Sequence, residues 1–300
     1  MTITRRGLMG GMAAGVACAG WTGAAWAAGA YRWPLGVQLW SVNPELDADF
    51  DGTLKALARL GYREVELAGL HGRSPAAFRQ ALASAGLRGV SAHYAMGDLL
   101  ADPEGCIAAA KGVGAEWLVC SSPKPDGPVP AGDWIAGIRQ AMTLSAWHTN
   151  AAALNRLGRM AKVAGLGFGY HNHPIEFARY DGQRGWDVLL AETDPNLVKL
   201  ELDVSWAVAG GEDPVALLRR HPARFRLLHV KGLRKAPPRG TYGDDFATGP
   251  VGKGDVIAWA PVFAAARQAG VVHAFVEQEP PHTQPILTSL AACRNYLQHL

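Results

Sequence analysis

Eight short apolar runs, separated by longer amphipathic stretches, constrain the fold of this 300-residue chain more than any other feature. The runs span residues 35–40, 64–67, 89–93, 117–120, 167–171, 199–203, 225–230 and 272–277. Residues 49–60, 75–85, 154–164 and 214–221 have a helical pattern, and glycine follows three of these segments, as is typical of helix C-termini. This alternation over about 250 residues predicts a single-domain (β/α)8 TIM barrel, with an open doubly wound sheet as the alternative.

The first 28 residues have the features of an export signal. Arg5 and Arg6 precede a Gly/Ala-rich run that ends in Ala25-Trp26-Ala27, a small-x-small cleavage pattern. We therefore expect a twin-arginine signal peptide over residues 1–28 and a periplasmic barrel domain over residues 29–300. The run is less apolar than a membrane span requires, so no stable span is expected after cleavage. Lipid anchoring at Cys18 is not expected, because the preceding residues match such a site poorly.

Charge and cysteine content exclude some functions. The formal net charge is +3, and two of these charges lie in the predicted leader, so no basic patch favours nucleic acid as a partner. Removing the leader leaves Cys106, Cys120 and Cys293, an odd number without paired spacing. We expect them to be core residues, with neither a disulfide framework nor a zinc motif.

Polar side chains end seven of the eight predicted strands. In a TIM barrel these C-terminal ends and the loops after them carry the functional residues. Buried polar groups need a partner or a ligand, because leaving them unpaired costs several kcal/mol. The residues, in strand order, are Gln38, Trp40 and Ser41; Glu66; His93; His171, His173 and Glu176; Glu201 and Asp203; His229 and Lys231; Glu277 and Glu279.

Strands five to eight are neighbours around a barrel, and their polar ends are suited to a metal ion. The stretch GFGYHNHPIEF places two histidines and a carboxylate directly after strand five. Mixed imidazole and carboxylate ligands suit Mn²⁺, Zn²⁺, Fe²⁺ or Co²⁺. Glu201 shares a face with Asp203 but is expected one layer deeper. The predicted ligands are His171, Asp203, His229 and Glu277.

The order of YHNHPIEF, LELDVSW, LLHVKG, VGKGD and FVEQE resembles the sugar phosphate isomerase/epimerase family, the xylose isomerase-like TIM barrels. The resemblance extends from about residue 34 to the C-terminus and implies one divalent ion, Mn, Zn, Co, Fe or Mg, held by Glu, Asp, His and Glu. Asp203, His229 and Glu277 match this pattern directly. Where many members have the first Glu, this chain has His171, so His171, His173 or Glu176 is the expected first ligand.

The implied chemistry is removal of a proton beside a metal-polarised carbonyl. The candidate bases are Glu277 and then Glu176, with His173 or His93 donating to the oxygen and Lys231 stabilising the enediolate or holding a hydroxyl. Trp40 and Trp206 offer apolar faces to sugar C–H edges. The expected substrate contacts are Gln38, Trp40, Glu66, His93 and Trp206.

The sequence thus predicts a periplasmic sugar isomerase or epimerase that acts on a small keto-sugar or polyol. Two alternatives remain: a metal-dependent lyase or hydrolase of 3-keto-glycosides or a dehydratase, and a non-catalytic sugar-binding protein. Residues 235–253 form the longest Gly/Pro-rich loop, a candidate lid. A homo-oligomer is compatible with the sequence.

Overall fold

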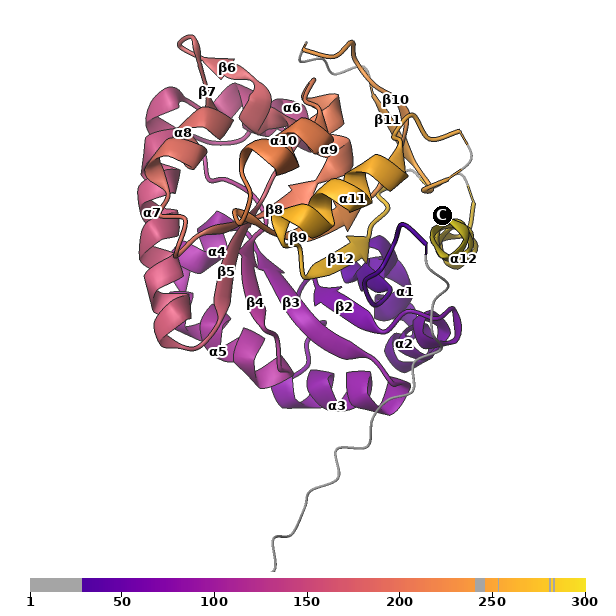
Figure 1. Ribbon diagram of the computed structural model, residues 1–300. Helices are drawn as coiled ribbons and strands as arrows, with labels where there is room; N and C mark the ends of the chain where they lie inside the picture. The colour runs from indigo at the N-terminus through magenta and orange to yellow at the C-terminus, as the bar shows by residue number, and fades with distance from the viewer. Residues whose placement is uncertain (1–28, 241–245, 253, 281, 283) are drawn as a thin grey trace, which may run out of the picture.

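The computed structural model describes residues 29–240, 246–252, 254–280, 282 and 284–300 (Figure 1). The predicted leader, residues 1–28, lies outside this part, as do positions 241–245 and 253 of the predicted lid loop. Eight parallel strands surround the central axis and helices cover them from outside (Figure 1). The predicted TIM barrel is therefore confirmed, and the open doubly wound sheet is excluded.

The barrel closes in the order β1-β12-β9-β8-β5-β4-β3-β2, so strands one and eight of the barrel are hydrogen-bonded neighbours. Two short antiparallel pairs lie outside it, β6 with β7 (Arg179–Tyr180 and Gln183–Arg184) and β10 with β11 (Gly232–Lys235 and Ala247–Gly249). The barrel strands are β1 Gly36–Gln38, β2 Glu64–Leu67, β3 Arg88–Tyr94, β4 Trp117–Cys120, β5 Gly167–His171, β8 Lys199–Asp203, β9 Phe225–Val230 and β12 His273–Val276.

Local capping signals position the helices. An acceptor side chain followed by proline begins α3, α5 and α10: Ser74, Asp102 and Asp213 each accept a hydrogen bond from a backbone N–H in the first turn. The α-helices are α1 Asn43–Ala48, α2 Phe50–Arg59, α3 Pro75–Ala85, α4 Met96–Ala101, α5 Pro103–Val113, α6 Trp134–Ala141, α7 Leu144–Val163, α8 Gly185–Glu192, α9 Val204–Ala209, α10 Pro214–Arg220, α11 Trp259–Ala269 and α12 Ile286–His299; the 3-10 helices are η1 Leu39–Val42 and η2 Pro174–Phe177.

Two predicted boundaries differ from the structure by more than one residue. The first strand ends at Gln38 instead of residue 40, because the Gln38 side chain accepts a hydrogen bond from the Trp40 backbone N–H and starts η1. The helix predicted over 154–164 begins at Leu144, where Thr143 caps it by accepting from the Ala146 N–H. In both places a side-chain cap, which hydrophobic periodicity does not report, sets the boundary.

Apolar side chains separate the two ends of the barrel interior. Val90, Val119, Leu227 and Phe275 form a compact interior cluster, with Trp117 packed against it. Trp117 fits because its neighbour on β5 is Gly167, where a Cβ atom would lie 2.5 Å from the indole ring. A larger core between strands and helices includes the three free cysteines, Cys106, Cys120 and Cys293, as expected.

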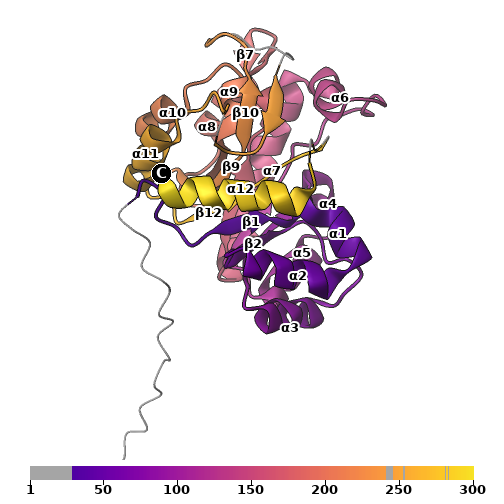
Figure 2. The ribbon, with the colours of Figure 1, turned by 90° about the vertical axis from the view of Figure 1, so that its right-hand side faces the viewer.

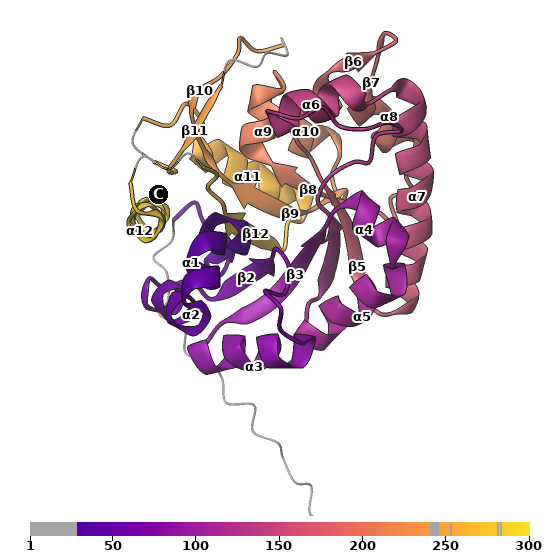
Figure 3. The same ribbon diagram turned by 180° about the vertical axis from the view of Figure 1, so that it is seen from behind.

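The loops that follow the strands build a tall rim at one end. The β6–β7 and β10–β11 pairs and α6 project at the same end in two perpendicular views, whereas α3 lies at the opposite end (Figures 1 and 2). Figure 3 shows the same arrangement from behind. Among the described residues, no helix has the length and apolar character needed to cross a membrane. The rim is therefore the place to look for the predicted site.

Candidate metal and active site

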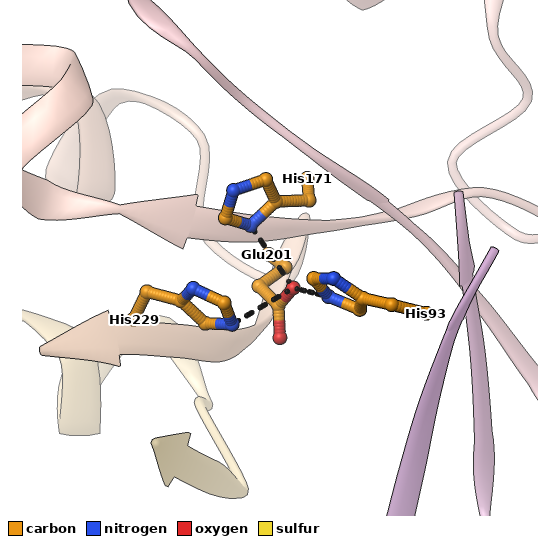
Figure 4. Close-up of side chains that lie close together, drawn as sticks. All are labelled: His93, His171, Glu201 and His229. Atoms are coloured by element: carbon orange, nitrogen blue, oxygen red, sulfur yellow. Dashed lines mark hydrogen bonds and ion pairs between the residues drawn. The ribbon is translucent and has the colours of Figure 1, made fainter. Parts of the chain in front are cut away.

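Three buried side chains and the partly buried His93, from four strands, converge beneath the rim (Figure 4). Glu201 Oε2 lies 2.6 Å from His93 Nε2, 3.1 Å from His171 Nδ1 and 3.4 Å from His229 Nε2. The ligand atoms of all four lie within 4.8 Å of one another. We call His93, His171, Glu201 and His229 the histidine cluster. In number and chemistry, three imidazoles and one carboxylate match a divalent transition-metal site.

Burial and mutual contacts shift the protonation of this cluster. Burial disfavours the charged form of His93, but the Glu66 and Glu201 carboxylates outweigh it and raise its pKa to about 9. Burial and the neighbouring Glu66 raise the pKa of Glu201 to about 7. Burial and the nearby His229 lower the pKa of His171 well below its usual value. Burial likewise disfavours the charged form of His229, but the Glu201 and Glu277 carboxylates outweigh it and raise its pKa well above the usual value.

Glu66 supports the histidine cluster from below. Its Oε1 lies 2.6 Å from His229 Nε2 and 3.0 Å from His93 Nε2, and it accepts a hydrogen bond from Gln38 Nε2 at 2.9 Å. Ser91 donates to the other carboxylate oxygen. Gln38 and Glu66 are fully buried and hydrogen-bonded to each other. In this arrangement Gln38 and Glu66 support the side chains of the histidine cluster and do not face a substrate.

A second buried cluster lies beside the first and is centred on an ammonium group. Lys231 Nζ lies 3.1 Å from Asp203 Oδ2, 2.8 Å from Glu277 Oε2 and 2.6 Å from Glu279 Oε1. It also lies 4.1 Å from the centre of the Trp206 ring. We call Lys231, Asp203, Glu277 and Glu279 the lysine cluster. Lys231 Nζ donates a hydrogen bond to Glu279 Oε1 and forms ion pairs with Asp203 and Glu277, so three carboxylates compete for the ammonium with the substrate hydroxyl predicted from the sequence.

His229 joins the two clusters through its two ring nitrogens. Nε2 faces the histidine cluster, whereas Nδ1 lies 3.1 Å from Glu277 Oε2 and 3.8 Å from Asp203 Oδ2. The structure therefore divides the predicted ligand set. His171 and His229 belong to one candidate metal group, and Asp203, His229 and Glu277 form another.

Two of the predicted catalytic residues have different surroundings. The Glu176 carboxylate accepts hydrogen bonds from the Tyr170 hydroxyl, at 2.6 Å, and from the His173 backbone N–H, at 2.8 Å. Side chains alternate along β5, so the Tyr170 side chain points away from the barrel interior, which His171 faces, and belongs to the core outside the barrel. Glu176 is hydrogen-bonded to Tyr170 and therefore does not face the clusters. Its burial raises its pKa to about 8. Glu176, predicted from the sequence as a base, is thus held by structural hydrogen bonds.

The His173 ring does lie above the histidine cluster. Its centre is 4.9 Å from that of His171 and 4.8 Å from that of Trp134. Burial and the Lys231 charge lower its pKa to about 3, and within the described residues its Nδ1 has no hydrogen-bond partner. Trp206 is buried against His173 and Lys231, whereas Trp40 is 52% exposed. Of the two tryptophans, only Trp40 offers a free apolar face.

Sequence reasoning placed Glu201 and Glu279 among the polar strand ends, with Glu279 as the alternative to Glu277 for the last ligand, but chose neither for the predicted ligand set. Glu201 is adjacent to His171 in the strand register, and a register shift between Leu200 and Glu201 accompanies its placement. The shared face with Asp203 was the available signal, because side chains alternate along a strand. Glu279 follows the end of β12, and its position depends on loop geometry that periodicity does not report.

Comparison with known proteins agrees with this architecture. The family model for the xylose isomerase-like TIM barrel matches residues 54–296. The chain is 24% identical to a sugar phosphate isomerase/epimerase from Parabacteroides distasonis, with a TM-score of 0.72 over 92% of this chain and 98% of the other. A xylose isomerase-like TIM barrel protein from Mycobacterium smegmatis, solved with magnesium, has a TM-score of 0.64 at 15% identity over 90% and 97% of the two chains. At these identities the likeness shows the fold.

A curated relative is similar over a shorter region. An inosose dehydratase from Clostridium tetani is 30% identical over 164 residues, which is 51% of this chain and 54% of the relative. The chain thus spans about half the length of the curated relatives it matches.

Proposed function

The chain belongs to the xylose isomerase-like TIM barrel family, and we propose that it is a metal-dependent enzyme that removes a proton beside the carbonyl of a keto-sugar or keto-polyol. The observation that carries the proposal is the convergence of His93 with the buried His171, Glu201 and His229 at the catalytic end of the barrel. Such a concentration of titratable groups with shifted pKa values is typical of an active site.

The histidine cluster fits a divalent ion. It offers three imidazole nitrogens and a carboxylate, a donor set suited to Zn²⁺, Fe²⁺, Co²⁺ or Mn²⁺. Within the described residues, Glu201 Oε1 is buried without a hydrogen-bond partner, as expected of an oxygen that binds an ion. When bound, such an ion polarises a carbonyl and makes the neighbouring C–H more acidic.

Residues around the cluster supply the proton chemistry. Glu277 bonds to Lys231 and His229, which outweigh its burial and lower its pKa, so it is a weak base. Burial and the Glu277 charge raise the pKa of Glu279, although Lys231 opposes the shift, and its side chain is 27% exposed. Glu279 is the more exposed of the two carboxylates and is therefore our candidate proton acceptor. The uncharged His173 ring, with Nδ1 free of protein partners in the described chain, accepts or donates a hydrogen bond at the substrate oxygen.

The fate of the carbanion determines the reaction class. Return of the proton at the same or the neighbouring carbon gives an epimer or isomer, our leading proposal. Loss of a hydroxyl from the adjacent carbon gives a dehydration product instead. The similarity to an inosose dehydratase favours this second candidate, because that relative's substrate is a keto-polyol.

Solvent exchange tests both candidates in one experiment. We would incubate the metal-loaded protein in D₂O with keto-sugars and with an inosose, using a chelated sample and His171→Ala as controls. Recovery of an epimer or isomer with one carbon-bound deuterium supports isomerisation, and a product lighter by one water supports dehydration. If no compound exchanges and sugar binding persists after chelation, the protein is a sugar-binding protein and the proposal is wrong.

A further inference from the structure

We propose that Gln278 and Ser289 are positioning residues for the reaction, because they anchor the segment that carries Glu279, the candidate proton acceptor, to helix α12. Neither side chain belongs to the histidine cluster or to the lysine cluster. The kinetic part of the inference rests on the proposed function, whereas the anchoring itself is tested on crystal structures, without an activity measurement.

The Gln278 side chain points away from the side that its two neighbours face. Glu277 and Glu279 both reach the Lys231 ammonium, at 2.8 and 2.6 Å. The side chain between them projects toward α12 instead, as alternation along an extended segment requires. Gln278 is 4% exposed, so its amide needs hydrogen-bond partners within the protein.

Two residues on one side of α12 supply these partners. The Ser289 hydroxyl donates to Gln278 Oε1 at 2.6 Å, and Gln278 Nε2 donates to Cys293 Sγ at 3.0 Å. Ser289 and Cys293 are four residues apart in α12 and therefore lie on the same side of the helix. Both are buried, as are Leu290 and Leu297, which pack α12 into the core. The helix is thus a fixed support for Gln278.

The anchor at Gln278 affects Glu279 more than Glu277. The Glu277 backbone N–H donates to the Val230 carbonyl of β9 at 3.3 Å, so strand pairing also holds this residue. The Gln278 backbone N–H donates to Ser41 Oγ at 2.8 Å. Within the described residues, Glu279 has no backbone hydrogen bond, so its position depends on Gln278, the last anchored residue before it.

The position of a proton acceptor has a strong effect on the rate. A displacement of about 1 Å, caused by a change remote from the reacting atoms, can lower a rate by about 10²-fold. Removal of the Ser289 hydroxyl takes away one of the three hydrogen bonds that hold Gln278. It also leaves Gln278 Oε1 buried without its donor, which favours a different orientation of the amide.

The kinetic test compares the parent with Ser289→Ala and Ser289→Thr. We expect kcat of Ser289→Ala to fall about 10-fold, with KM and metal content close to the parent's, because Glu279 acts in the transition state and Ser289 is remote from substrate and ion. Ser289→Thr keeps the hydroxyl and retains the parent's kcat. An equal loss of kcat in both variants would overturn the inference.

The matched control is Thr193→Val, which also removes a buried hydroxyl. Thr193 Oγ1 donates to the Leu189 carbonyl at 2.6 Å and accepts from Arg224, the residue before β9, at 2.8 Å. This hydroxyl lies where the strands begin, so its loss lowers stability and leaves kcat at the parent's value. Equal losses of kcat in Thr193→Val and Ser289→Ala would assign the effect to stability alone and overturn the inference.

A double variant shows whether Ser289 acts through Glu279. In a Glu279→Gln background, Ser289→Ala is expected to change kcat little, because the carboxylate that it positions is already gone. The same fall of kcat in both backgrounds would contradict a positioning role.

Crystal structures of the parent, Ser289→Ala and Gln278→Leu test the anchoring itself. We expect the Glu279 carboxylate to be displaced by about 1 Å or more in both variants, and if Gln278→Leu does not fold, Ser289→Ala decides. An undisplaced Glu279 overturns the inference. Displacement of Glu279, in a protein whose parent form converts no keto-sugar or inosose, supports the anchoring and contradicts the proposed function.

Discussion

The interior of the barrel has histidine–glutamate pairs at both ends, and a single strand contributes to each. Glu64 and Glu66 lie two residues apart on β2 and both point inward. At the end where the strands begin, Glu64 Oε2 lies 2.8 Å from His273 Nδ1. At the end where they finish, Glu66 Oε1 lies 2.6 Å from His229 Nε2. Phe275 lies between, its ring centre 6.2 Å from that of each histidine.

The surroundings of the two pairs differ. Arg88 lies 2.8 Å from Glu116 and 3.9 Å from Glu64, and both Arg88 and Glu116 are more than half exposed, so the first pair lies beside an exposed ion pair. At the opposite end, further histidines and carboxylates converge, and Glu201 Oε1 is left without a partner in the described chain. Residue type alone therefore does not define a site. Convergence, burial and unsatisfied atoms do.

The largest expected contrast is between His171→Ala and His273→Ala. Loss of His171 removes a ligand of the histidine cluster, so metal content and activity both fall to background. Loss of His273 leaves both close to the parent's, because that ring pairs only within the opposite end. Metal analysis and turnover of purified variants measure this. Equal metal loss in the two variants would show that the two ends of the barrel do not differ in metal binding.

Next in size is Glu279→Gln. Its carboxylate is our proton acceptor, so kcat falls by roughly 10²- to 10⁴-fold while the ion in the histidine cluster remains. Single-turnover kinetics together with metal analysis provide the check. A parent-like rate would assign the base to another residue.

A smaller effect is expected from Glu277→Gln. Glu277 orients His229 through Nδ1 and does not belong to the histidine cluster, so ion affinity weakens by about 10- to 100-fold without being abolished. Titration with a competing chelator measures the affinity. A loss as complete as that of His171→Ala would show that the ion lies beside Glu277 instead.

A still smaller effect is expected from Trp40→Ala, at the rim of the barrel. Its exposed ring is expected to pack against the apolar face of the substrate, so KM rises by about 2- to 10-fold while kcat and metal content stay nearly constant. Steady-state kinetics distinguish these quantities. An unchanged KM would exclude Trp40 from substrate binding.

The smallest effect concerns stability at the opposite end. Burial disfavours the charge on His273, but Glu64 and Glu116 outweigh it and raise its pKa. A raised folded-state pKa gives stability that is complete below the unfolded value, about 6.5, and is lost as pH rises through the folded value. His273→Gln should therefore cost about 1 kcal/mol at pH 5.5 and less at pH 9. Denaturant unfolding at the two pH values measures this, and a larger cost at pH 9 would contradict the assignment.

Much of the fold could be predicted from local pattern. The predicted bounds of five barrel strands agree with the structure: β2, β4, β5, β8 and β9. These segments are short, apolar and bounded by turns, so local periodicity and burial favour the same structure. The errors at Gln38 and Leu144 arose where a single side-chain hydrogen bond set the boundary.

The candidate site was predicted only as a set of strand ends. His171 and His229 meet at one centre, as the sequence indicated, because neighbouring parallel strands finish on the same rim. The inclusion of His93 and Glu201, the enclosure of Lys231 by carboxylates and the withdrawal of Glu176 toward Tyr170 were not apparent from spacing. Ligands from separate strands have no fixed separation in sequence, and a one-residue register shift moves a side chain to a different neighbour.

The sequence by itself determined the barrel and the residues that face its catalytic end, because strand alternation and helix periodicity are local properties. Only the tertiary structure decided which of those residues share a centre, because that depends on strand register around the closed barrel and on how buried charges pair across it.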